Sequence, residues 1–152
     1  MMEGNMSNPG SQMPNESNSA ISMIVGTTAL VLVLPVVVIA LMELMDYIEY
    51  DSEFKWIIYS MVFSLTIISI LLISGLYLAG LINSDNTKMG VGIYLISLSA
   101  LNLLIRLSYL NEERGMWYGG VSWFEFIQYP WVHEQLEIAF LGILIGALIM
   151  KK

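Results

Sequence analysis

The sequence predicts an all-α integral membrane protein, a bundle of four transmembrane helices, and three observations support this fold class. Strongly apolar runs without charge lie between Glu16 and Glu43, Lys55 and Asp85, Lys88 and Arg106, and Glu137 and Lys151. Hydrophobic residues form 57% of the chain and charged residues only 12%, about half of the roughly 25% that is typical of soluble domains. The longest polar stretch is the first 19 residues, so no segment remains for a soluble core.

Each span needs about 20 mostly apolar residues, which places the four spans at about 20–44, 56–82, 89–110 and 131–150. Pro35 lies inside the first span, where its ring removes one helical hydrogen bond. Residues 1–19 are rich in Asn, Ser, Gly and Met and are predicted to form a flexible tail. Residues 20–152 then form the transmembrane domain. A tight turn at 83–86 is expected between the second and third spans.

An aromatic segment precedes the last span. Ser122 is followed three residues later by Glu125, which is the pattern of a capping box. This pattern predicts a short helix at 122–129, with aromatic side chains at the depth of the lipid headgroups. Pro130 suits the first turn of the last helix, because its missing N–H needs no partner there.

The last span is short. Only 13 residues separate Glu137 from Lys151, about 20 Å of helix. To cross the membrane, this helix must begin near Trp131, which draws Glu137 and Glu134 toward the hydrocarbon. Either the bilayer thins there, or these carboxylates face the interior of the bundle. A carboxylate inside a membrane needs a partner. Arg106 is a candidate for a structural ion pair with Glu137, although its long side chain, one turn from the end of the third span, can also reach the interface.

An acidic face is predicted at one side of the membrane. An even number of spans places both chain ends on one side and the first and third loops on the other. Carboxylates and an imidazole on the loop side are candidates for an ion, proton or metal site: Asp46, Glu49, Glu53, His133, Glu134 and Glu137. The alternative is that these acids are solvated, with Lys55 and Arg106 neutralising the buried ones.

Small residues occur at helix-packing spacing in two spans. Gly142 and Gly146 form a GxxxG motif in the last span, and Gly75 and Ala79 repeat the spacing in the second. Such positions let helix backbones approach closely in lipid, which predicts a compact bundle.

Several functional classes are disfavoured by composition. The chain has no cysteine, which excludes disulfides and thiolate metal sites, and a single histidine, which excludes bis-histidine haem ligation within the chain. Its net charge of -7 argues against nucleic acid as a partner. Walker, GxGxxG and nucleophile-elbow motifs are absent from the sequence. We therefore expect no cofactor and regard an enzymatic activity as the less favoured function.

The expected protein is a multi-pass membrane protein surrounded by lipid, with both termini on the same side. Basic residues divide equally between the two sides, so the positive-inside rule does not decide the orientation; the pair Lys151 and Lys152 favours termini inside. The preferred function is a non-catalytic accessory or structural subunit that associates with other membrane subunits or with itself. The alternative is an ion- or proton-handling or cation-binding protein that uses the acidic loops.

Overall fold

A computed structural model describes residues 13–50 and 53–151, and four long helices dominate it. These are α1 (Met13–Glu49), α2 (Phe54–Leu78), α3 (Asp85–Trp117) and α5 (Pro130–Lys151). A short helix, α4 (Trp123–Phe126), precedes α5. Each long helix is sufficiently long and apolar to cross a membrane. The predicted all-α fold of four transmembrane helices is therefore confirmed, and the protein is an integral, multi-pass membrane protein.

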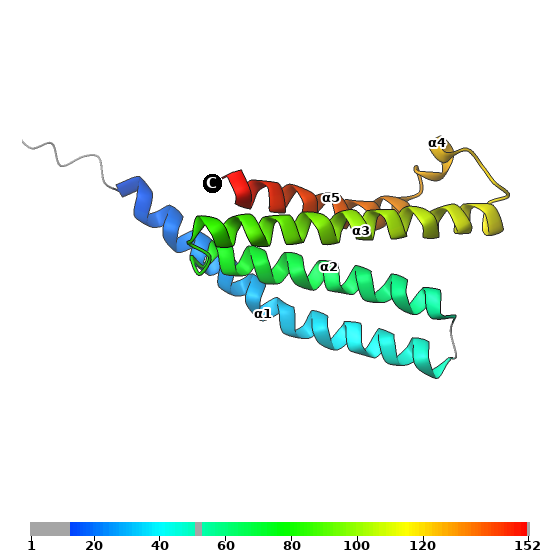
Figure 1. Cartoon of the computed structure of the whole chain (residues 1–152), viewed down its shortest axis with the longest axis horizontal. Helices are drawn as coiled ribbons and strands as arrows, with labels where there is room; N and C mark the ends of the chain where they lie inside the picture. The colour runs from blue at the N-terminus through cyan, green and yellow to red at the C-terminus, as the bar shows by residue number, and fades with distance from the viewer. Residues whose placement is uncertain (1–12, 51–52, 152) are drawn as a thin grey trace, which may run out of the picture.

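The helices lie side by side in the order α1, α2, α3, α5 (Figure 1). The most extensive contacts join α1 to α2 and α3 to α5, and α2 also contacts α3 and α5. Helix α1 is peripheral, because only 6% of its most apolar stretch is buried, against 35% for α5. The C-terminus and the start of α1 lie at one end of the molecule, and the α1–α2 and α3–α5 connections lie at the other (Figure 1). This arrangement agrees with the topology expected from an even number of spans.

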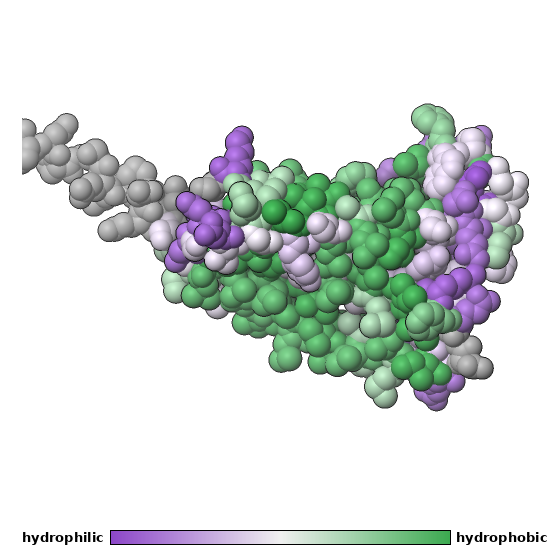
Figure 2. Space-filling model, in the orientation of Figure 1, coloured by the Kyte–Doolittle hydropathy of each residue, from purple (hydrophilic) through white to green (hydrophobic). Residues whose placement is uncertain are grey.

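The surface divides into an apolar middle and two polar ends (Figure 2). Apolar residues cover the middle, whereas hydrophilic residues gather where the helices are connected. Helices α1 and α3 continue into these polar ends, so they are longer than the spans expected at 20–44 and 89–110. The apolar run marks where a helix meets lipid, whereas the helix itself continues for as long as its backbone hydrogen bonds do. Residues 1–12 of the predicted tail lie outside the described residues, and from Met13 onward the backbone is helical.

Glycines set the closest approach of the helices. A Cβ atom on Gly26 would lie 2.6 Å from the backbone nitrogen of Ala79 and 2.8 Å from the carbonyl oxygen of Gly75. A Cβ atom on Gly146 would lie 2.8 Å from the carbonyl oxygen of Gly92. Both distances are too short for a larger side chain, so α1 meets α2, and α3 meets α5, through backbone rather than side chains.

The residues of both predicted packing motifs lie at these contacts. Gly75 and Ala79 face α1, and Gly142 and Gly146 face α3, where Gly142 lies against Ser99. The glycines that face them, Gly26 and Gly92, were not among the predicted positions. Neither belongs to a GxxxG repeat in its own helix.

The connection between α2 and α3 begins earlier than the expected turn at 83–86. Helix α2 ends at Leu78, and Gly80 adopts a φ of 76°. The amide of Leu81 donates to the carbonyl of Leu76 and that of Gly80 to the carbonyl of Tyr77, the two bonds of a Schellman motif. Gly80 stops the helix because it accepts a left-handed conformation without steric cost. Asp85, expected in the turn, is instead the first residue of α3.

A short helix before the last span is confirmed, together with its capping box, but it covers only Trp123–Phe126 of the expected 122–129. The hydroxyl of Ser122 accepts a hydrogen bond from the amide of Glu125, whose side chain accepts one from the amide of Ser122. Pro130 is the first residue of α5, as predicted. Arg114 ties this segment to α3, because its Nη1 donates to the carbonyls of Val121 (2.5 Å) and Gly120 (3.2 Å).

Two apolar clusters hold the bundle together. Ile70, Ile73, Leu95 and Ile149 join α2, α3 and α5 in the apolar middle. Leu110, Phe126, Val132 and Leu136 form the second cluster at the loop end, where α4 folds onto α3 and α5. Phe126 is fully buried, so α4 is anchored by a large aromatic side chain.

Candidate functional site

Polar side chains are buried in the middle of the bundle. Among the described residues they are Thr66 and Ser69 on α2, and Ser99, Asn102 and Arg106 on α3. The three α3 residues recur at helical spacing and therefore share one face. Lys88 and Glu112 flank this part of α3 and are 24 residues apart, about 36 Å of helix. Ser99 and Asn102 thus lie near the centre of a hydrocarbon layer about 30 Å thick.

Asn102 is buried at a cost in stability. Within the described part of the chain, neither its amide oxygen nor its amide nitrogen has a hydrogen-bond partner, and the same is true of the Ser99 hydroxyl. Thr66 differs, because its hydroxyl donates to the carbonyl of Val62 at 2.7 Å. An unsatisfied buried polar group costs about 1–3 kcal/mol. Packing alone does not explain Asn102 at this position.

Arg106 is held inside the bundle rather than at the interface. Its side chain is only 8% exposed, its guanidinium carbon lies 4.1 Å from the centroid of the Phe63 ring, and its Nη2 donates to the carbonyl of Tyr59 at 3.3 Å. Glu112 lies six residues further along α3, so Arg106 is about 9 Å below that charged position. An aromatic face and a backbone carbonyl of α2 bind Arg106 within the bundle, which disfavours the alternative that its side chain reaches the interface.

A polar pocket of about 250 Å³ opens beside Arg106, between α1, α2 and α3. Its polar lining consists of Glu43, Tyr47, Tyr59, Ser60, Arg106 and Tyr109. The hydroxyl of Ser60 donates to Oε2 of Glu43 at 3.2 Å. The pocket therefore presents a guanidinium, a carboxylate and several hydroxyl groups to one small volume.

Aromatic rings form one wall of this pocket. Trp56, Tyr59 and Tyr109 contact one another edge to face, with ring centroids 5.3–5.8 Å apart. Such packing fixes the orientation of the three rings. Above them, Nζ of Lys55 lies 2.5 Å from Oε1 of Glu112 and 3.2 Å from Oε2 of Glu53. The pair of Lys55 with Glu112 joins α2 to α3 at the loop end of the pocket.

The predicted acidic face is divided into two groups. Asp46 and Glu49 are exposed near the end of α1 and Glu53 pairs with Lys55, whereas the other group is on α5: His133, Glu134 and Glu137. Helices α1 and α5 lie at opposite edges of the layer (Figure 1). Across residues 13–50 and 53–151, no three Asp, Glu or His side chains are placed to hold a metal ion. The structure thus brings the six residues to one end of the molecule but not to one site.

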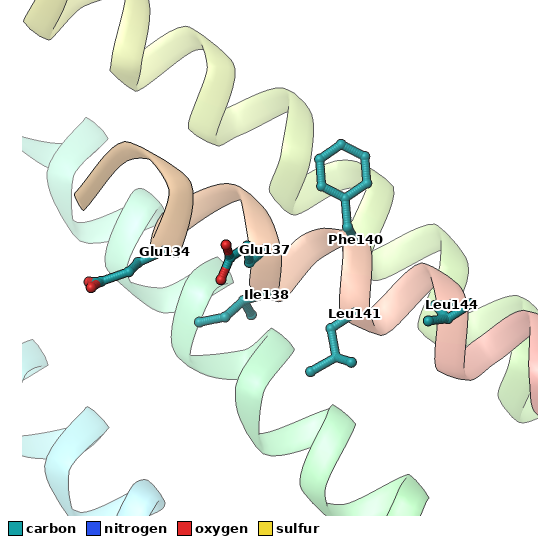
Figure 3. Close-up of a pocket in the computed structure, with 6 residues that line it drawn as sticks. All are labelled: Glu134, Glu137, Ile138, Phe140, Leu141 and Leu144. Carbon is teal, nitrogen blue, oxygen red and sulfur yellow. The ribbon is translucent and has the colours of Figure 1, made fainter. Parts of the chain in front are cut away.

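Glu134 and Glu137 lie on the outside of the bundle. Both residues line an open groove on α5 together with Phe140 and Leu144 (Figure 3). Both side chains are exposed, so they do not face the bundle interior, which was one of the two alternatives from the sequence. The ion pair between Glu137 and Arg106 stays a prediction, which a double-mutant cycle tests directly.

The polar pocket was largely missed by reasoning from the sequence. Its lining comes from three helices, and hydroxyl or aromatic residues at the end of a span are ordinary features of membrane helices. One signal was available: Ser99, Asn102 and Arg106 share a helical face within an otherwise apolar run. A polar stripe in that position indicates the bundle interior.

Comparisons with known proteins give no match: no family model, no curated protein and no solved structure matches this chain. Function is therefore argued from the geometry of the described residues.

Proposed function

We propose that the protein is a non-catalytic subunit of a membrane assembly, in which a membrane helix of another protein covers the outer face of α5. One observation carries this proposal. The carboxylate of Glu137 is exposed on the outside of the bundle at a depth that belongs to hydrocarbon. A charge facing lipid at that depth is costly, so a partner at this face is favoured.

The depth of Glu137 follows from two helices. On α5, about 20 Å of helix separates Glu137 from Lys151, about 10 Å less than the thickness of the hydrocarbon. The packing of α5 against α3 gives a second estimate. Gly142 of α5 lies against Ser99 of α3, and Gly146 of α5 lies against Gly92 of α3. Continuing this antiparallel register places Glu137 opposite residues 101–104 of α3, about 12–16 Å below the level of Glu112. Both estimates put the carboxylate inside the apolar layer.

Charge complementarity favours a different protein over a second copy of this chain. Lys55 and Lys88 are held in ion pairs with acids of their own chain. Arg106 is buried, Arg114 binds carbonyls of the α3–α5 connection, and Lys151 lies at the other end of α5. The described basic residues thus offer no exposed cation at the depth of Glu137. A partner helix with Lys or Arg at that depth satisfies the carboxylate.

A defined probe helix tests this proposal. The full-length protein is co-expressed with a leucine-rich transmembrane helix that carries one central Arg, and association is measured by energy transfer in proteoliposomes. We expect the Arg helix to associate and the same helix without Arg to remain separate. Glu137→Gln should abolish association, whereas Glu49→Gln, an exposed acid at the end of α1, should preserve it. Equal association of both probe helices would contradict the proposal.

Gentle-detergent purification from native membranes tests the same idea with natural partners. A complex whose additional subunit is lost from Glu137→Gln and retained in Glu49→Gln supports it. Migration of the wild-type protein as a lone monomer counts against it.

The alternative function is ion or proton handling, and the presence of two carboxylates, Glu134 and Glu137, in the lining of one groove favours it (Figure 3). It predicts that Glu137→Gln abolishes flux in proteoliposomes of the purified chain while thermal stability is unchanged. Absence of flux in the wild-type protein excludes this alternative and leaves the assembly proposal intact.

A further inference from the structure

The pocket beside Arg106 carries two opposite charges on two helices. Glu43 enters it from α1 and Arg106 from α3, and both line the same volume of about 250 Å³. A simple anion bound to Arg106 meets the carboxylate of Glu43, and a simple cation bound to Glu43 meets the guanidinium. A ligand that bears both charges can contact both groups at once.

The Arg106 side of the pocket suits a phosphate. A guanidinium presents five N–H donors in a rigid fork, a geometry that matches phosphate and carboxylate oxygens. Phe63 and the carbonyl of Tyr59 hold this fork in place, so little side-chain freedom is lost on binding. Tyr47 and Tyr109 also line the pocket, and a tyrosine hydroxyl can donate a hydrogen bond.

The Glu43 side suits an ammonium group. Ser60 donates to one oxygen of the Glu43 carboxylate, and the aromatic rings of Trp56 and Tyr59 lie in the same lining. A carboxylate beside aromatic rings attracts organic cations by charge and by the ring quadrupole. The two sides therefore recognise different ends of one molecule.

Size and depth restrict the ligand further. A pocket of about 250 Å³ lies below the range of about 300–1,000 Å³ that holds drug-sized molecules. Its Trp56 and Tyr109 lie toward the loop end, next to the charged residues Lys55 and Glu112, and such aromatic residues are common near membrane interfaces. Both properties fit a headgroup-sized ligand.

We propose that this pocket binds a small zwitterion in which a phosphate lies on Arg106 and an ammonium group lies on Glu43. The headgroup of a phosphoethanolamine lipid and a free phosphoethanolamine compound share this chemistry. Binding at this pocket is independent of the assembly proposed at α5, because the two sites lie on different helices.

Thermal unfolding of the purified full-length protein in a neutral detergent tests the proposal. The probes are glycerophosphoethanolamine, which carries both charges, glycerol 3-phosphate, which carries only the anion, and ethanolamine, which carries only the cation. We expect glycerophosphoethanolamine to raise the Tm and to bind at least about tenfold more tightly than either half, because each half lacks one of the two charge-assisted contacts.

Variants of the two charged residues provide the specificity test. Glu43→Gln and Arg106→Gln should each weaken binding at least about tenfold, and the control Glu49→Gln should bind as the wild type does. Arg106→Gln removes a buried charge and could unfold the protein. Arg106→Lys is therefore the second variant, because it keeps the positive charge and loses only the forked geometry of the guanidinium. Weak binding by Arg106→Lys supports the phosphate contact.

Two outcomes overturn the proposal: no stabilisation by glycerophosphoethanolamine, or equal stabilisation by glycerol 3-phosphate that Glu43→Gln does not reduce. Nanodiscs then identify the source of the ligand. Higher stability in phosphatidylethanolamine than in phosphatidylglycerol, with loss of the difference in Glu43→Gln, supports a lipid headgroup. Stabilisation by the soluble compound in both lipids supports a free solute. Either result leaves the test at Glu137 unaffected, so failures of the two proposals are distinguishable.

Discussion

In the folded protein, the guanidinium carbon of Arg106 lies 4.1 Å from the centroid of the Phe63 ring. This contact joins α3 to α2 below the level of the charged residues Lys55 and Glu112. It places a cation against an aromatic face inside the bundle, where the attraction is stronger than at an exposed site. The same contact positions Arg106 at the polar pocket.

The first prediction concerns this contact. Phe63→Leu should lower the free energy of unfolding by about 1–2 kcal/mol, because a leucine side chain has no ring quadrupole to attract the guanidinium. Unfolding in detergent by heat or denaturant measures the loss. Phe54→Leu is the matched control: Phe54 is on the same helix and 74% exposed, so it should change stability by less than about 0.5 kcal/mol. Additive losses from Phe63→Leu and Arg106→Met would show that the two side chains are not coupled.

The second prediction concerns the approach of α1 to α2. Gly26→Ala should destabilise the protein by about 1–3 kcal/mol, because the added methyl group meets backbone atoms of Gly75 and Ala79 and overpacking forces a backbone shift. Gly90→Ala should stabilise it by about 0.5–1 kcal/mol, since Gly90 is helical, nothing lies within 4 Å of a Cβ there, and alanine is the better helix former. Thermal unfolding of both variants checks the opposite signs. If Gly90→Ala lowered the stability as much as Gly26→Ala does, the loss at Gly26 would come from reduced backbone flexibility rather than from close helix packing.

The third prediction concerns the unsatisfied amide of Asn102. Asn102→Leu should leave stability unchanged or raise it by up to about 2 kcal/mol, because an apolar side chain of similar size removes an unpaired buried group. Asn111→Leu provides the contrast. The amide oxygen of Asn111 accepts a hydrogen bond from Nη2 of Arg114 at 3.2 Å, so its loss should cost about 0.5–1.5 kcal/mol. If Asn102→Leu is the more damaging variant, the Asn102 amide is bound by water or by a ligand in the membrane.

The fourth prediction concerns the cap of α4. Ser122→Ala should cost about 1 kcal/mol, because it removes the hydroxyl that accepts from the Glu125 amide. Hydrogen exchange should become faster at the amides of 125–127, while exchange in α5 is unchanged. Ser108→Ala, at an exposed helical position of α3, is the control and should leave both exchange and stability near wild type. Faster exchange throughout the bundle would instead mean that the cap supports the whole fold.

Local patterns in the sequence determined the fold class and the connection before the last span. Apolar runs of membrane-crossing length determine the number of spans, because a lipid environment requires the backbone of each span to form its own hydrogen bonds. The capping box at Ser122 and the proline at 130 determine where α4 and α5 begin, because both act on residues within one helical turn. The expected depth of Glu137 also follows from chain length, since 13 residues to Lys151 form too short a span.

The tertiary structure alone decided which faces of the helices meet. The pocket combines Glu43, Ser60 and Arg106 from three helices, and its residues are up to 66 positions apart in the sequence, from Glu43 to Tyr109. Burial of Arg106 depends on Phe63 and Tyr59 of α2, and the position of Glu137 outside the bundle depends on how α5 is rotated against α3. Helical spacing relates residues within one helix, whereas the rotation of one helix against another is set by side-chain packing, above all at Gly92 and Gly146. For that reason the sequence predicted a shared acidic face, and only the packed bundle separated its two groups.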